Sequence, residues 1–505
     1  MSGDLSIGID LGTSGVRVVA VSHEGATVAA ARRALHSHRE AGRHEQDPVQ
    51  WWQCTAEGLA EATAQIDARR VTGIAVCSTS GTVTVLDAGR SPVLPGLMYD
   101  DLRAADHTPA VRQAGADLWR RMGYRPQPSW ALSTLAFLAT TDPGVLHAKG
   151  NRLAHQADVV TGELIGGDVA TDTSHGLKSG ADLLACRWPA AVFDALGVPT
   201  AILPELVLPG TRLGTVSTAA AQRSGLRAGT PVFAGMTDGC AAALGSGAVG
   251  VGDWNSVLGT TLVLKGVTER LRPDPTGALY SHRGAAPDTW LPGGASGVGA
   301  GSISALLPGH DPNTLTGQAL RSRPLPAYPL LGRGERFPFV NAEAHGFCHT
   351  GDAERPWDAH LPEFVGAAPL LATILHSVSC VERLAFETLA RAGFEVSGSV
   401  RITGGASGNA GWNRLRATML QRPLLVPHSG EPATGMAVLA TWAADPSRRL
   451  EDVAAAMVRI REVVDPEPDA RAIEEYYQNF RTELVRRGWL DDGQGSIPVE
   501  SGKPR

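Results

Sequence analysis

The sequence lacks several features that mark common classes of protein. Its six cysteines are scattered and none forms a CxxC pair, so neither a zinc site nor a disulfide framework is expected. No apolar run reaches the roughly 20 residues that a membrane helix needs, and a strand pattern begins almost at the N-terminus, which leaves no room for a signal peptide. The formal net charge of −6 provides no basic surface for nucleic acid. We therefore expect a cytoplasmic protein without nucleic-acid or membrane partners.

Two familiar nucleotide-binding motifs are also missing. No Gly-x4-Gly-Lys-Ser/Thr string is present, which argues against a P-loop enzyme, and no Gly-x-Gly-x-x-Gly follows the first strand, which argues against a dinucleotide-binding Rossmann domain. The 505 residues are too many for one ordinary core, so we expect two large domains.

The sequence does contain one kind of turn twice. Residues 7–10 form an apolar run that ends in an acid, and the Gly-Thr-Ser-Gly turn at 12–15 leads into a second apolar run. Residues 254–265 repeat the order of strand, Gly-Thr-Thr turn and strand. Such turns can cradle a phosphate, and Asp10 could hold a hydrated Mg²⁺. One such turn is equally well explained as an ordinary hairpin, but two of them indicate a duplicated unit with a nucleotide between the halves.

Polar residues follow two further strand patterns. The buried strand predicted at 71–77 runs into residues 78–82, Ser-Thr-Ser-Gly-Thr, and small hydroxyl residues at a strand's carboxyl end can meet a polyol. Turns of this composition are common, so the signal is weak by itself. A strand at 231–234 is followed by Asp238, which opens an Ala-rich helix. A helix cap is the ordinary explanation of this aspartate.

A third strand pattern, at residues 400–403, ends in Gly404 and Gly405 and leads into a helix. The two glycines allow the backbone to approach a flat ring closely. Asn409 can form hydrogen bonds there, and Trp412 can stack or pack. A plain strand-to-helix turn is the alternative.

The two hairpins resemble the paired phosphate loops of the actin, sugar-kinase and heat-shock ATPase superfamily, and the chain to about residue 485 resembles the FGGY carbohydrate kinase family. The resemblance implies an α/β fold of two ribonuclease H-like (actin-like ATPase) domains with a nucleotide cleft between them. We place an N-terminal sugar-binding domain at 1–247 and a C-terminal nucleotide-binding domain at 248–485, whose last helices can pack back on the first. Residues 486–505 are rich in Gly, Ser and Pro and are expected to be a disordered tail.

The resemblance also implies a role for each motif. Asp238 would be the catalytic residue, and Asp238 and Asp10 would bind the metal. The residues expected to bind the substrate are Asp10, Ser78, Thr79, Ser80, Gly81 and Asp238. The residues expected to bind ATP are Gly12, Thr13, Ser14, Gly259, Thr260, Thr261, Gly404, Gly405, Asn409 and Trp412.

The implied activity is an ATP- and Mg²⁺-dependent sugar kinase acting on the terminal hydroxyl of a ketopentose. We favour D-ribulose, because residues 12–17, 236–240 and 328–339 are similar to a pentulose-kinase branch of the family. A D-xylulose kinase, a non-kinase nucleotide switch of the same superfamily and an inactive sugar sensor remain as alternatives. Tyr99 and Asp100 replace the family's usual Trp-Asn pair, which puts a sugar-specific role of that element in doubt. The expected partner is a small sugar, and the expected state is a monomer or homodimer.

Overall fold

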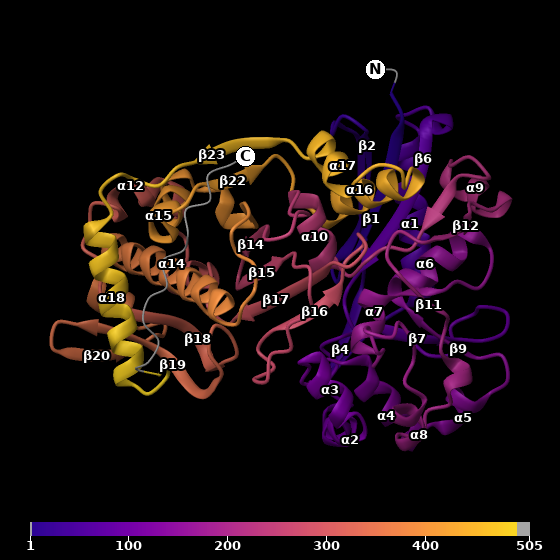
Figure 1. Ribbon diagram of the computed structural model, residues 1–505, viewed down its shortest axis with the longest axis horizontal. Coiled ribbons are helices and arrows are strands. Elements are labelled where there is room, and N and C mark those ends of the chain that lie inside the picture. The colour runs from indigo at the N-terminus through magenta and orange to yellow at the C-terminus, as the bar shows by residue number, and fades with distance from the viewer. Residues whose placement is uncertain (1–2, 492–505) are drawn as a thin grey trace.

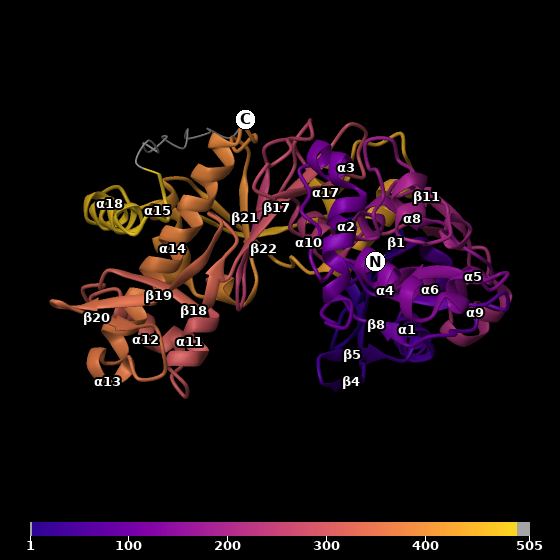
Figure 2. The ribbon, with the colours of Figure 1, turned by 90° about the horizontal axis from the view of Figure 1, so that it is seen from below.

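Two large sheets organise the computed structural model, which describes residues 3–491 (Figure 1). The first has the strand order β12-β13-β6-β1-β2-β3, and the second has the order β16-β17-β15-β14-β21-β22-β23. Seen along the perpendicular direction, the two halves lie side by side, and α10 (Asp238–Ser246) lies near their junction in both views (Figure 2). Each sheet contains one of the two predicted hairpins, which places the hairpins in different halves of the molecule.

The strands of the first sheet are β1 (Leu5–Leu11), β2 (Gly15–Ser22), β3 (Thr27–Ala34), β6 (Val71–Ser78), β12 (Arg212–Thr215) and β13 (Pro231–Phe233). The strands of the second sheet are β14 (Trp254–Leu258), β15 (Leu262–Gly266), β16 (Tyr280–Arg283), β17 (Trp290–Ser296), β21 (Val400–Thr403), β22 (Leu424–Pro427) and β23 (Ile460–Val464). Smaller sheets are formed by β4 (Ser37–Glu40), β5 (Arg43–Gln46), β7 (Val83–Leu86), β8 (Gly96–Leu97) and β9 (Arg152–His155), by β10 (Thr171–Asp172) and β11 (Leu206–Val207), and by β18 (Ala327–Glu335), β19 (Asn341–Thr350) and β20 (Ala353–Pro356).

The helices of the first half are α1 (Pro48–Thr63), α2 (Thr108–Ala114), α3 (Ala116–Met122), α4 (Ala131–Thr141), α5 (Pro143–His147), α6 (Gln156–Ile165), α7 (Thr173–Lys178), α8 (Ala190–Ala195), α9 (Thr218–Ser224) and α10. Those that follow are α11 (Gly301–Leu306), α12 (Pro312–Ala319), α13 (Pro362–Val365), α14 (Ala367–Arg391), α15 (Ala410–Leu420), α16 (Pro432–Ala444), α17 (Leu450–Met457) and α18 (Arg471–Arg486).

Strand β1 lies in the middle of its sheet, between β2 and the parallel strand β6. Its apolar residues are fully buried, as expected for a strand covered on both faces. Helix α16 approaches one face so closely that a Cβ at Gly8 would lie 1.8 Å from the carbonyl oxygen of Ala433. Only glycine permits this contact. A helix from the second half of the sequence therefore completes the core of the first sheet. The domain boundary at residue 247 stays a prediction, and α16 crosses it to pack on the first half.

Helix α1 follows its sequence signals. Asp47 caps it by accepting a hydrogen bond from the backbone N–H of Val49, and Pro48 occupies the first turn. Trp51 and Trp52 are buried and pack in the core beneath the first sheet. Both tryptophans therefore pack the helix against the sheet.

Helix α14 is the long helix of the second half (Figure 2). Within residues 3–491 it is the one helix long and apolar enough to cross a membrane by length and composition, and 89% of its most apolar window is buried inside the protein. Its residues form the centre of the second hydrophobic core. The helix is therefore accounted for as a core helix.

The predicted disordered tail begins too early. Helix α18 ends at Arg486, and the chain then continues into the core: Leu490 is buried, and the ring of Trp489 lies 5.5 Å from that of Tyr328 in a T-shaped contact. Aromatic contacts of this kind hold residues 487–491 against the β18–β19 hairpin. The prediction is wrong for these residues, and the rest of the predicted tail lies outside the described part of the chain.

Candidate active site

The carboxyl ends of three neighbouring parallel strands meet at one edge of the first sheet. Strand β6 lies between β1 and β13 and runs parallel to both. Asp10 on β1 is in register with Cys77 on β6, and Ser78 forms a bridge with Thr237, the residue before Asp238. The two predicted aspartates and the start of the predicted sugar loop therefore share one edge. Ligands of open α/β sheets bind at such edges.

Asp238 is the first residue of α10, with Thr237 as the N-cap. Its Oδ1 accepts a 2.6 Å hydrogen bond from the backbone N–H of Gly239. Burial raises the pKa of Asp238 above its ordinary value, against the opposing effect of that hydrogen bond and of nearby cations. A carboxylate with a raised pKa accepts a proton more readily near neutral pH, which suits a general base.

Asp10 is the second carboxylate of the site. Burial, followed by the negative charge of Asp238, raises the pKa of Asp10 to about 6. The two carboxylates are thus close enough for one to disfavour ionisation of the other. A divalent cation between them would offset that repulsion, and carboxylate oxygens are ligands that Mg²⁺ accepts. The donor set fits the expected metal.

A cavity of about 450 Å³ opens beside Asp238, between the two halves of the molecule. Its wall on the side of the first half includes Thr79, Ser80, Tyr99, Lys178, Thr237, Asp238 and Cys240. Its wall on the side of the second half includes Val257, Val263, Lys265, Tyr280, His282 and Gly294. A second cavity of about 430 Å³ shares Tyr99, Lys178 and Tyr280 with the first, so the two adjoin.

The predicted sugar loop reaches this cavity only in part. Thr79 and Ser80 line it, and the hydroxyl of Ser80 is buried with no hydrogen-bond partner among the described residues. Ser78 is fully buried: its hydroxyl bonds to Nε2 of His175 at 2.8 Å and accepts from a backbone N–H of α6. The Ser78 hydroxyl is thus occupied by partners within the protein, and the assignment of Ser78 to the sugar stays a prediction. Gly81 has φ +99° and serves the turn itself.

The first hairpin turn is held in place from the side. The N–H of Gly12 donates to the carbonyl of Gly15 at 3.0 Å, which closes the turn. The carbonyl of Thr13 accepts a 2.7 Å hydrogen bond from Nε2 of Gln46, whose Oε1 is in turn held by the indole N–H of Trp51. Ser14 is exposed at the tip. Helix α1 thus positions the turn, and the assignment of Gly12, Thr13 and Ser14 to ATP stays a prediction.

The second turn is built in a similar way. The N–H of Gly259 donates to the carbonyl of Thr261, and the carbonyls of Gly259 and Thr260 accept from backbone N–H groups at the start of α11. Thr260 is exposed. Val257 and Val263, which flank this turn, line the cavity beside Asp238. The hairpin thus reaches the cavity from the second half, and its contact with ATP also stays a prediction.

The third predicted nucleotide motif has both exposed and buried parts. Gly404 and Gly405 are exposed, and Gly404 has φ +84°. Asn409 caps α15 with its Oδ1 and donates through Nδ2 to Thr316, so both ends of its amide are occupied. Trp412 is buried in the core, and its indole N–H donates to α14. Both residues serve the strand-to-helix turn that is the alternative explanation, and the assignment of Gly404, Gly405, Asn409 and Trp412 to ATP stays a prediction.

Sequence reasoning missed several groups that line the cavity. Lys178 ends the short helix α7, and Lys265, Tyr280 and His282 come from β15 and β16. One signal was available: a lysine after three apolar residues in strand β15 is unusual in a buried strand. The others carry no local pattern, because Lys178 on α7 meets residues of β15 and β16 only through the packing of the two halves.

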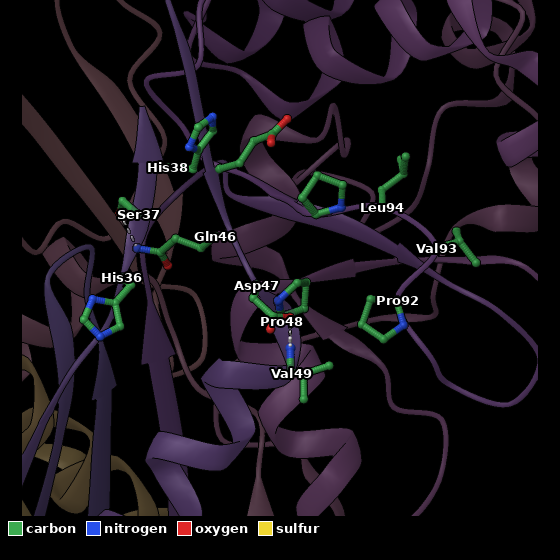
Figure 3. Close-up of a pocket in the computed structure, with 12 residues that line it drawn as sticks. His36, Ser37, His38, Gln46, Asp47, Pro48, Val49, Pro92, Val93 and Leu94 are labelled. Carbon is green, nitrogen blue, oxygen red and sulfur yellow. Dashed lines mark hydrogen bonds between the residues drawn. The ribbon is translucent and has the colours of Figure 1, made fainter. Parts of the chain in front are cut away.

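A larger cavity, of about 650 Å³, lies away from this site, between β5, the start of α1 and residues 92–95 (Figure 3). His36, His38 and Gln46 are among the residues that line it. Its two carboxylates have structural partners, because Glu45 pairs with Arg103 and Asp47 caps α1. Gln46 connects it to the first hairpin through the carbonyl of Thr13.

Comparison with known proteins agrees with this arrangement. The model of the N-terminal domain of the FGGY family of carbohydrate kinases matches residues 5–245, and that of the C-terminal domain matches residues 308–444. The chain is 27% identical over 466 residues to a xylulose kinase of Streptomyces coelicolor, with 85% of each chain covered. It is 27% identical over 503 residues to an apulose kinase of Pectobacterium atrosepticum, with 95% of this chain and 97% of that protein covered.

A solved structure confirms the predicted fold class. The crystal structure of a "xyloylose kinase" from Brucella ovis superimposes with a TM-score of 0.84 at 25% identity, covering 96% of this chain and 100% of that chain. The fold is therefore that of two actin-like ATPase domains, as the hairpins predicted. The chain belongs to the FGGY family of carbohydrate kinases and is a sugar kinase.

Proposed function

We propose that this sugar kinase transfers the γ-phosphoryl group of ATP to the terminal hydroxyl of a ketopentose, with D-ribulose as the first candidate. The observation that carries the proposal is the position of Asp238, a half-buried carboxylate of raised pKa on the wall of a cavity of about 450 Å³ beside Asp10. That volume is within the range of small-molecule sites.

The chemistry follows from the weakness of the nucleophile. A primary alcohol attacks phosphorus poorly at neutral pH, so Asp238 would align the hydroxyl and accept its proton as the new P–O bond forms. Mg²⁺ held near Asp10 would neutralise charge on the phosphates. The turns at 12–14 and 259–261 would hold the triphosphate from either side. Closure of the two halves would bring donor and acceptor into line and keep bulk water out.

D-Xylulose is the second candidate, because several relatives are xylulose kinases by name. D-Ribulose rests on the sequence of residues 12–17, 236–240 and 328–339. The two sugars differ only in configuration at one carbon, so the shape of the cavity wall rather than the charge of the site must decide between them. We further propose a cytoplasmic monomer or homodimer as the working form.

The test is sugar-dependent release of ADP. Purified protein with Mg-ATP is assayed against D-ribulose, D-xylulose, L-ribulose and glycerol. We expect ADP release only with a ketopentose, and mass spectrometry should find one added phosphoryl group on the sugar. Rapid ADP release that is indifferent to every sugar would refute the proposal.

A further inference from the structure

The wall of the cavity on the side of the second half carries a buried cation without an anionic partner. Lys265 is 5% exposed, and no carboxylate pairs with it among residues 3–491. Its Nζ lies 3.0 Å from Nδ1 of His282 and 3.4 Å from the carbonyl oxygen of Leu291, and 5.3 Å from the ring centre of Tyr280. Burying an ammonium group is costly unless its protons find acceptors. The third proton of Lys265 is available to a ligand.

His282 offers a second donor. Burial and the nearby charges of Lys265 and Lys178 lower the pKa of His282 well below its ordinary value, so the ring is neutral. Its Nδ1 accepts a hydrogen bond from the ammonium group of Lys265, so the single ring proton lies on Nε2. That Nε2 is buried and has no hydrogen-bond partner within the described part of the chain. An unpaired buried donor of this kind is uncommon and calls for a partner.

The two donors face the substrate from the half opposite to the proposed base. Both residues line the same cavity as Asp238, and the positive charge of Lys265 acts on the Asp238 carboxylate. Lys265 lies near the end of β15, four residues after Thr261 of the turn, and four residues of strand span about 13 Å. The phosphate turn and the cation are therefore at opposite ends of one strand. A sugar whose terminal hydroxyl meets Asp238 would direct its other oxygens away from the phosphates and towards this pair.

We propose that Lys265 and His282 form a subsite that donates two hydrogen bonds to the carbonyl oxygen of the acceptor sugar, which makes Lys265 a specificity-determining residue that selects ketoses over polyols. A carbonyl oxygen has two lone pairs and no proton, so it matches a pair that donates and does not accept. A hydroxyl in the same place carries a proton for which neither side chain offers an acceptor. The inference rests on the proposed function, because it assumes that the sugar's terminal hydroxyl lies at Asp238.

The test compares a ketose with the polyol that its reduction gives. D-Ribulose is paired with ribitol, and D-xylulose with xylitol; a polyol that is not turned over is measured as a competitive inhibitor. Wild-type protein is compared with Lys265→Met, which keeps the length of the side chain and removes its charge. Lys178→Met is the matched control, because Lys178 lines the same cavity from the first half.

We expect Lys265→Met to lower kcat/KM for the ketose on the order of 10- to 100-fold, mainly through KM. The kcat/KM or inhibition constant of the polyol should change much less. Lys178→Met should leave the ratio of ketose to polyol unchanged. ADP affinity of Lys265→Met should match the wild type, and its Tm should be equal or higher, because the substitution removes a buried charge without an anionic partner. A merely structural lysine would lower both.

Two results would overturn the inference. One is that Lys265→Met weakens the ketose and the polyol by the same factor. The other is that Lys178→Met changes the ratio of ketose to polyol as much as Lys265→Met does. Wild-type protein that phosphorylates a ketopentose and yet gives either result keeps the proposed function and loses this subsite. Wild-type protein that phosphorylates no ketopentose loses both.

Discussion

Replacing Asp10 by asparagine should stabilise the folded protein while it abolishes turnover. The folded chain raises the pKa of Asp10 from 3.8 to about 6, chiefly by burial and then through Asp238. One pKa unit corresponds to about 1.4 kcal/mol, so the buried charge costs about 3 kcal/mol at pH 8. Asparagine has the same shape and no charge, and it can still accept the weak hydrogen bond from the thiol of Cys77.

The direction in which stability changes with pH follows from the raised pKa of Asp10. The folded protein holds the Asp10 proton to higher pH than the unfolded chain does. Stability from this group is therefore present at low pH, declines between about pH 4 and about pH 6, and is fully lost above. Asp10→Asn should thus raise the Tm by roughly 3 to 6 °C at pH 8, and by less at pH 5. Wild-type activity should fall at acid pH, because protons compete with Mg²⁺ for the Asp10 carboxylate, and raising the Mg²⁺ concentration should move that fall to lower pH.

Scanning calorimetry without ligands at pH 8 and pH 5 measures the effect. Asp352→Asn is a suitable control, because Asp352 is exposed in the turn between β19 and β20. Addition of Mg-ATP should stabilise wild-type protein more than Asp10→Asn. An Asp10→Asn protein that is less stable than the wild type at pH 8 would refute the reasoning.

Three other substitutions probe the site and its support. Asp238→Ala should lower kcat roughly 10²- to 10⁴-fold with little change in sugar affinity, and near-wild-type turnover would mean that the base is another residue. Gly404→Ala should weaken ADP binding, because its Cβ would lie 2.5 Å from a β14 carbonyl at φ +84°, whereas the control Gly332→Ala, on the exposed part of β18, has open space; equal titrations of ADP would contradict this. Arg416→Ala should cost about 3–5 kcal/mol in urea unfolding, because it leaves the buried Glu382 unpaired; a loss below 1 kcal/mol would contradict this.

The placement of the site could be predicted from strand ends. An acid closes the run at residues 7–10, and another follows the strand at 231–233, so the rule for parallel sheets brings Asp10 and Asp238 to one edge. The repeated Gly-Thr turn predicted the two halves in the same way. These signals are local, because they depend on strand direction and turn geometry rather than on the packing of distant side chains.

The burial of individual side chains could not be predicted in this way. Ser78 and Trp412 have the chemistry of ligand contacts, yet neighbouring helices cover them. Lys265 and His282 meet only because β15 and β16 both pair with β17. Such contacts depend on tertiary packing between segments that carry no shared pattern.

The central claim is that the two hairpin turns hold one triphosphate across the cavity that contains Asp238. A crystal structure with Mg²⁺, a non-hydrolysable ATP analogue and D-ribulose tests it most directly. We predict phosphates between residues 12–14 and 259–261, and the sugar's terminal hydroxyl within hydrogen-bond distance of the Asp238 carboxylate. Phosphates bound away from either turn, or an Asp238 carboxylate directed away from the sugar, would contradict it.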